Sequence, residues 1–132
     1  MDDIKTDYQN FADNWTPLNG CEFESEEGKV YIKTINNDPY FESDFSIPED
    51  KENLILGIIN LKIPVPDVFQ VYYKYRDSNY SQYYMDSFNL ELGCSTIFID
   101  LTEHKNLEKI RIDPAMSDVD CTIEKIELFY IN

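Results

Sequence analysis

The stretch from residue 107 to residue 131 contains two runs in which apolar and polar side chains alternate. In the first run Ile110 and Ile112 alternate with charged residues, and in the second Ile126 and Leu128 flank Glu127 in the same way. Strict alternation with a period of two predicts half-buried β-strands, and Pro114 separates the two runs because proline donates no hydrogen bond to a sheet. A pair of strands is not stable alone in water, so the rest of the chain must supply sheet beside them.

The upstream sequence predicts further short strands at regular spacing. Turn-forming pairs such as Asn19-Gly20 and Asp38-Pro39 separate the apolar runs, and no segment has the pattern of an amphipathic helix. The strands are expected at 21–25, 29–35, 40–46, 53–63, 69–76 and 95–101, with one or two short edge strands within 80–92. This arrangement predicts an all-β fold, a jelly-roll β-sandwich of two antiparallel sheets with about eight to ten strands.

The length of 132 residues fits one domain with a single core. We expect residues 1–20 to form a lead-in segment and residues 21–132 to form the sandwich. Trp15 is the largest apolar residue in the lead-in segment, and it is expected to dock onto the sandwich or to lie at its rim.

The charge of the chain argues against two classes of partner. With 26 acidic and 11 basic residues the formal net charge is −15. Such a surface repels phosphate backbones and anionic lipid, so neither a nucleic acid nor a membrane is expected as a partner. The sequence shows no signal peptide and no transmembrane segment, and its three cysteines have no paired spacing. The localisation stays unknown, although reduced cysteines favour the cytoplasm or a domain of a larger protein.

Motifs for catalysis are missing from the sequence. The chain has one histidine, His104, in a polar connection that suggests a surface position, and it lacks the nucleophile-elbow, phosphate-loop and zinc-binding motifs. The many carboxylates do not single out a pair for glycoside cleavage. We therefore expect a protein that is not an enzyme.

The order of short motifs along the chain resembles a known superfamily. Trp15 is followed by Gly28-Lys29-Val30-Tyr31-Ile32, Asp38-Pro39-Tyr40-Phe41, Phe69-Gln70-Val71-Tyr72-Tyr73, Ile110-Arg111-Ile112-Asp113-Pro114 and Ile123-Glu124-Lys125-Ile126-Glu127-Leu128. This order resembles the galactose-binding-like jelly rolls, which include many lectin-like carbohydrate-binding modules. Such modules are appended to bacterial glycosidases, glycosyltransferases and polysaccharide-related proteins.

The resemblance implies a non-catalytic, carbohydrate-binding accessory domain, with a glycan as its ligand and a neighbouring catalytic domain in a longer parent protein. It also implies that Asp38 and Asp113 cap turns. The family often carries one structural Ca²⁺ near the first and last strands, where this chain has Glu22, Glu24 and Glu124. Ca²⁺ accepts six to eight oxygen ligands in irregular geometry, which suits such residues.

A glycan site needs aromatic rings for stacking and polar groups for the sugar hydroxyls. The outward positions of the expected strands carry such residues, and basic groups among them suggest an acidic or phosphorylated glycan. The expected ligand contacts on the sheet face are Asn60, Lys62, Tyr72, Lys74, Arg76 and Arg111, with Trp15 and Tyr40 at the rim.

Three alternatives stay open at this stage. Loop tyrosines such as Tyr80, Tyr83 and Tyr84 offer a second possible binding region. A structural or protein-interaction sandwich would present an apolar patch in place of an aromatic and polar face. A catalytic domain would need a deep pocket with two carboxylates.

Overall fold

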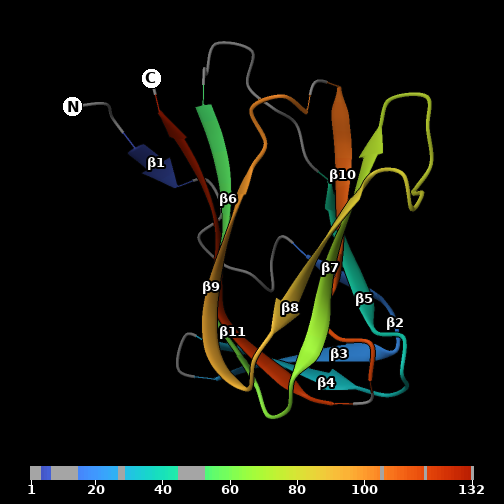
Figure 1. Cartoon of the computed structure of the whole chain (residues 1–132), viewed down its shortest axis with the longest axis vertical. Coiled ribbons are helices and arrows are strands. Elements are labelled where there is room, and N and C mark those ends of the chain that lie inside the picture. The colour runs from blue at the N-terminus through green and yellow to red at the C-terminus, as the bar shows by residue number, and fades with distance from the viewer. Residues whose placement is uncertain are drawn as a thin grey trace.

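A computed structural model shows a two-layered β-sandwich (Figure 1), and it describes residues 4–6, 15–26, 29–44, 53–104, 106–117 and 119–131. The described residues form eleven strands and no helix. The strands are β1 (Ile4–Thr6), β2 (Thr16–Asn19), β3 (Cys21–Glu26), β4 (Lys29–Thr34), β5 (Tyr40–Asp44), β6 (Asn53–Ile63), β7 (Asp67–Tyr75), β8 (Met85–Leu90), β9 (Gly93–Asp100), β10 (Leu107–Asp113) and β11 (Cys121–Ile131).

The strands form two antiparallel sheets, which confirms the predicted jelly-roll sandwich. One sheet has the order β3-β4-β11-β6-β9, with β1 paired to β11, and the other has the order β2-β5-β10-β7-β8. We call them the six-stranded and the five-stranded sheet. Strand β2 falls within the expected lead-in segment but is an edge strand of the five-stranded sheet, while residues 1–3 and 7–14 lie outside the described part.

The two C-terminal strands are central, and they belong to different sheets. Strand β10 lies between β5 and β7, whereas β11 lies between β4 and β6. They are therefore not paired as a hairpin, because the chain crosses from one layer to the other after Pro114. Each supplies the middle of a sheet and turns a series of buried side chains to the core. The alternation breaks once in each strand, between Leu107 and Ile110 in β10 and between Ile123 and Ile126 in β11.

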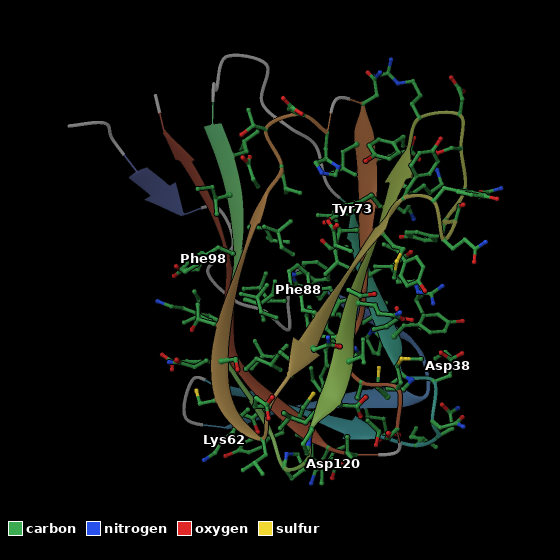
Figure 2. The ribbon with its side chains drawn as sticks, viewed as in Figure 1. Asp38, Lys62, Tyr73, Phe88, Phe98 and Asp120 are labelled. Carbon is green, nitrogen blue, oxygen red and sulfur yellow. The ribbon has the colours of Figure 1, made fainter. Side chains whose placement is uncertain are left out.

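The core fills the space between the layers. Figure 2 shows Tyr73 and Phe88 between the two sheets, while Phe98 points away from them and is 61% exposed. Trp15 and Phe23 both meet the ring of Phe41 edge-on, at centroid distances of 5.6 and 5.2 Å. These contacts join the start of β2 to strands of both sheets.

The inward positions of β6 change parity along the strand. Leu56 and Ile58 are buried, and so are Leu61 and Ile63, with a register shift against β9 between Ile58 and Leu61. Asn60 has a φ of 52°, a left-handed backbone that is typical of a β-bulge. Alternation extended back from Leu61 would place Ile59 inward, but Ile58 is the buried residue, because alternation cannot be extended through a bulge.

Glycine is required at the turn between β2 and β3. Gly20 has a φ of 62°, and a Cβ there would lie 2.2 Å from Oδ1 of Asn36. The Gly20 carbonyl accepts a hydrogen bond from Ile35 N at 2.7 Å. Asn36 Oδ1 also accepts from Asp38 N at 2.8 Å, so Asn36 caps the neighbouring turn between β4 and β5.

Candidate functional site

The outward face of the five-stranded sheet brings together residues from three neighbouring strands. On β10, Arg111 pairs with Glu42 of β5 on one side and with Tyr72 of β7 on the other. Paired residues in adjacent strands present their side chains on the same face. This register places a cation, a carboxylate and an aromatic ring in one row.

Three tyrosine rings surround the guanidinium group of Arg111. Its Cζ atom lies 3.9 Å from the ring centroid of Tyr40, 4.7 Å from that of Tyr72 and 5.7 Å from that of Tyr80. Arginine stacks on aromatic faces because its planar cation is weakly hydrated and is attracted by the π-electrons. The stack holds Tyr40 and Tyr72 in position on the sheet face.

Arg111 is also locked by a bidentate ion pair. Its Nε and Nη2 donate to the two carboxylate oxygens of Asp113 at 2.8 and 2.7 Å. The side chains are 20% and 7% exposed, respectively. Burial raises the pKa of Asp113, and Arg111 opposes that rise by stabilising the charged carboxylate. The predicted turn-capping role of Asp113 was therefore wrong, because its carboxylate is occupied by Arg111.

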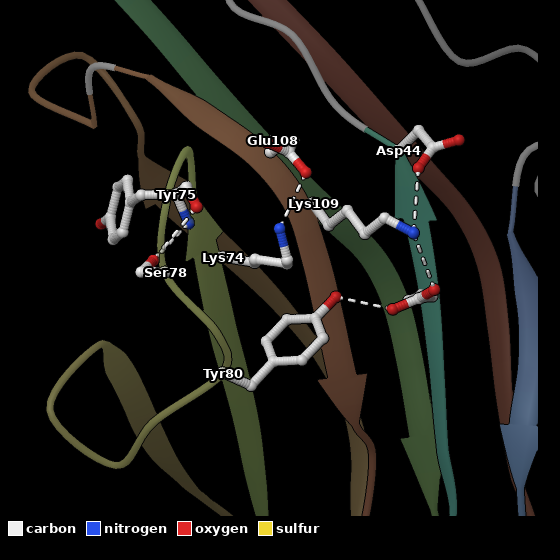
Figure 3. Close-up of polar contacts among 8 residues, drawn as sticks. Asp44, Lys74, Tyr75, Ser78, Tyr80, Glu108 and Lys109 are labelled. Carbon is white, nitrogen blue, oxygen red and sulfur yellow. Dashed lines mark hydrogen bonds and ion pairs between the residues drawn. The ribbon is translucent and has the colours of Figure 1, made fainter.

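A second polar network crosses the same face (Figure 3). The Tyr80 hydroxyl donates to Oε2 of Glu42 at 2.7 Å, and Lys109 Nζ lies 3.3 Å from Oε1 of the same carboxylate. Lys109 also pairs with Asp44 at 3.4 Å, and Lys74 pairs with Glu108 at 2.8 Å. Each lysine on this face therefore has a carboxylate partner.

Polar groups continue from Tyr72 toward the β8 edge. The Tyr72 hydroxyl donates to Oε1 of Gln70 at 3.4 Å, and Gln70 Nε2 donates to Ser87 Oγ at 3.4 Å. Both contacts are long, and the one between Gln70 and Ser87 is exposed, so they are easily exchanged for contacts with a ligand. Aromatic faces flanked by such polar groups suit a ring-shaped molecule that carries hydroxyls.

The predicted sheet-face contacts divide between the two layers. Tyr72, Lys74 and Arg111 lie together on the five-stranded sheet, with Tyr40 beside them. Asn60 and Lys62 lie on β6 of the six-stranded sheet, and Asn60 Nδ2 donates to Glu124. Placing all of them on one face was therefore wrong, because an outward position does not reveal which sheet a strand joins.

Trp15 and Arg76, two other predicted contacts, do not lie beside Tyr72 on the sheet face. Trp15 is only 2% exposed and packs edge-on against Phe41, so its predicted role as a rim contact was wrong. Arg76 follows β7 in an exposed turn, where its backbone N–H donates to the carbonyl of Asn106 at 2.9 Å. Its position at the strand end keeps it apart from the tyrosine cluster.

The predicted calcium ligands do not form a cluster. Glu22 and Glu24 are exposed on β3, whereas Glu124 on β11 accepts the hydrogen bond from Asn60. Among the described residues, no group of three or more His, Cys, Asp and Glu side chains could hold a metal ion. A structural Ca²⁺ in this chain stays a prediction, with no site built from these three glutamates.

A separate pocket of about 340 Å³ lies at the connection between β9 and β10, lined by Asp100, Thr102, Glu103 and His104. Hydrogen bonds from Thr102 lower the pKa of Asp100, which is opposite to the shift that a general acid needs. His104 is partly buried and held by aromatic side chains: its Nδ1 lies 2.6 Å from the Tyr75 hydroxyl, and its ring lies 4.4 Å from that of Tyr73. The pocket therefore carries no evidence for acid–base catalysis.

Sequence reasoning missed several members of the site. The pair Arg111 and Asp113 was detectable, because residues two apart in a strand lie on the same face. Tyr80 was named only among loop tyrosines, and its contact with Glu42 joins residues 38 positions apart. No local pattern predicts such a contact.

Solved structures of several carbohydrate-binding modules share this fold. A CBM4 structure matches with a TM-score of 0.66 at 13% identity, over 92% of this chain and 89% of that chain. A family 29 carbohydrate-binding module from Piromyces equi matches with a TM-score of 0.63 at 8% identity, over 99% and 91%. The CBM22-1–GH10 modules of a Clostridium thermocellum endo-1,4-β-D-xylanase, complexed with xylohexaose, match at 0.67 and 13% identity, over 95% of this chain but 28% of that chain.

No protein-family model and no curated protein matches this sequence. At these low identities the likeness concerns the fold, because sites vary widely within one fold. No helix in the described part of the chain is long and apolar enough to cross a membrane. The comparisons thus confirm that this chain shares the jelly-roll β-sandwich fold of these carbohydrate-binding modules.

Proposed function

We propose that this chain is a non-catalytic domain that binds a poly- or oligosaccharide on the outward face of its five-stranded sheet. The observation that carries the proposal is the pair of tyrosine rings, Tyr40 and Tyr72, stacked on the ion-paired Arg111. Sugar rings stack on aromatic side chains through their apolar faces, and their hydroxyls need nearby donors and acceptors. Gln70 and Glu42 offer such groups beside Tyr72 and Tyr80.

The charge of this face favours a neutral glycan. Arg111, Lys109 and Lys74 are all ion-paired, and the carboxylates that pair with them are Asp113, Glu42, Asp44 and Glu108. A phosphate or uronic acid group would have to displace one of these carboxylates and would meet an acidic surface. The acidic or phosphorylated glycan suggested by the basic residues is therefore disfavoured.

The fold comparisons support an accessory role. One similar structure contains the CBM22-1 and GH10 modules of a xylanase, complexed with xylohexaose. We extend only the general arrangement to this chain: a sugar-binding domain that acts beside a catalytic domain of the same parent protein.

The protein-docking alternative has less support. It would require a contiguous apolar patch. The exposed large apolar side chains belong to several different strands and loops of the described residues, namely Leu18, Ile35, Val65, Leu92, Phe98 and Met116. The contiguous aromatic surface lies instead on the five-stranded sheet.

The proposal is tested by measuring binding to a panel of neutral and acidic polysaccharides by affinity electrophoresis, and then to matching oligosaccharides by calorimetry. The Tyr72→Ala variant should bind at least about tenfold more weakly, since it loses one stacking surface. Lys62→Ala, on the other sheet, is the matched control and should bind as wild type does. Glycan binding that Tyr72→Ala leaves unchanged, or that Lys62→Ala removes, would overturn the proposal.

A further inference from the structure

The connection between β7 and β8 places Tyr80 over the candidate site. This connection covers residues 76–84, and the Tyr80 side chain extends from it across the sheet face to Glu42 on β5 (Figure 3). Burial raises the pKa of the Tyr80 hydroxyl, and its hydrogen bond to Glu42 raises the pKa further. Tyr80 is therefore packed into the face and is not a free loop side chain.

The contacts of Tyr80 are those that a sugar ring would need at the same place. Its ring faces the guanidinium of Arg111 at 5.7 Å, and its hydroxyl donates to the Glu42 carboxylate at 2.7 Å. A six-membered sugar has a similar width, an apolar face and hydroxyl donors. A glycan cannot make these contacts with Glu42 and Arg111 while Tyr80 occupies them.

The loop is built so that Tyr80 can leave without loss of sheet pairing. At one end, Ser78 N donates to the Tyr75 carbonyl at 3.1 Å; at the other, Tyr84 N donates to the Ser81 carbonyl at 3.0 Å. Tyr84 also packs edge-on against Tyr75 at 5.2 Å. These two turns fix the ends of the loop, and Tyr80 lies between them.

We propose that Tyr80 is a latch that occupies part of the glycan site and selects for ligands able to displace it. The inference rests on the proposed function. When a binding-competent state is only partly populated, the apparent affinity falls by the populated fraction. One hydrogen bond to a charged group and one ring contact hold the latch closed. The free energy needed to open it lowers the apparent affinity of wild type for the glycan by about tenfold.

The test compares wild type with Tyr80→Ala and Tyr80→Phe by calorimetry against neutral oligosaccharides of increasing length. Tyr80→Ala should bind about tenfold more tightly, because nothing competes for Glu42 and Arg111. Tyr80→Phe keeps the ring but loses the hydrogen bond, so its affinity should rise by about threefold. Tyr83→Ala is the matched control, because Tyr83 lies in the same loop but is 83% exposed.

The outcomes separate the latch from the function. Equal or weaker binding by Tyr80→Ala, with near-UV circular dichroism showing an intact fold, would overturn the latch and leave glycan binding in place. Binding by Tyr80→Ala where wild type shows none would support both. Absence of binding in every variant would overturn the proposed function and the latch together.

Discussion

The outward faces of the two sheets differ in how their charged side chains are held. On the five-stranded sheet, Arg111 is ion-paired with the buried Asp113 and stacked against tyrosines. On the six-stranded sheet, Lys33 and Asp120 form an ion pair at 3.6 Å in which both side chains are about half exposed. The first face is a network of rings and ion pairs, whereas on the second the Lys33–Asp120 pair is solvated and the Lys125 side chain, paired with Glu127 at 2.9 Å, is 46% exposed. This difference supports the first face as the proposed binding surface.

Preorganisation matters because binding costs conformational freedom. Tyrosines held by Arg111 lose little further freedom when a sugar stacks on them, whereas the exposed lysines of the other face would lose much more. Both faces carry acidic and basic side chains. Their difference lies in packing and pairing, which depend on the register of β5, β10 and β7.

The largest effect is expected from Arg111→Met. This change leaves the buried Asp113 carboxylate without its partner, and breaking such a pair costs about 3 kcal/mol of unfolding free energy. Lys62→Met on the six-stranded sheet should change the free energy by less than about 0.5 kcal/mol. Denaturant unfolding measures both. Equal effects of the two variants would contradict the distinction between the faces.

The cost of Arg111→Met should depend on pH. Burial already raises the pKa of Asp113, and removal of Arg111 removes the charge that opposes the rise. A carboxyl whose pKa is raised in the folded state stabilises that state while protonated, and this contribution is lost as the pH rises above the ordinary value. The variant should therefore lose less unfolding free energy, relative to wild type, near pH 4 than near pH 7. Chemical denaturation at the two pH values measures this difference.

The matched control for that pH effect is the double variant Arg111→Met/Asp113→Asn. The amide that replaces the Asp113 carboxyl does not titrate. The loss of unfolding free energy in the double variant, relative to wild type, should therefore change much less between pH 4 and pH 7 than it does in the single variant. A deficit of Arg111→Met that is the same at both pH values would show that Asp113 is not the group that responds.

The smallest effects are expected on the outward face of the six-stranded sheet. Phe98→Ser replaces an exposed ring on the edge strand β9, so it should leave glycan affinity unchanged and shift the unfolding free energy by less than about 0.5 kcal/mol. Calorimetry with the best oligosaccharide checks the first expectation, and denaturant unfolding checks the second. A loss of binding in Phe98→Ser would move the ligand to the other sheet.

Alternation of side chains predicted most of the strands. The bounds of β6 agree with the expected 53–63, and β10 and β11 appear where the alternating runs predicted them. Local pattern was sufficient there because each strand has one core-facing side. It failed at Asn60, where the bulge shifts the inward positions, and at the edge β2, whose exposed residues carry no alternating signal.

The site was predictable only in part. Tyr72, Lys74 and Arg111 were predicted on one sheet face and lie together there, because each occupies an outward position in its strand. Tyr40, predicted at the rim, lies beside Arg111 on the same face. The separation of Asn60 and Lys62 from them required the strand order, which no local pattern contains. The burial of Trp15 likewise depends on its contact with Phe41, 26 positions further along the chain.

The measurement that tests the central claim most directly is a two-dimensional ¹H–¹⁵N NMR titration of the wild-type chain with a neutral oligosaccharide. We expect the largest shift changes at the amides of Glu42, Arg111 and Tyr72 and at the side-chain Nε–Hε of Arg111. Changes confined to β6, β9 and β11, or to the pocket around His104, would contradict the assignment of the ligand face.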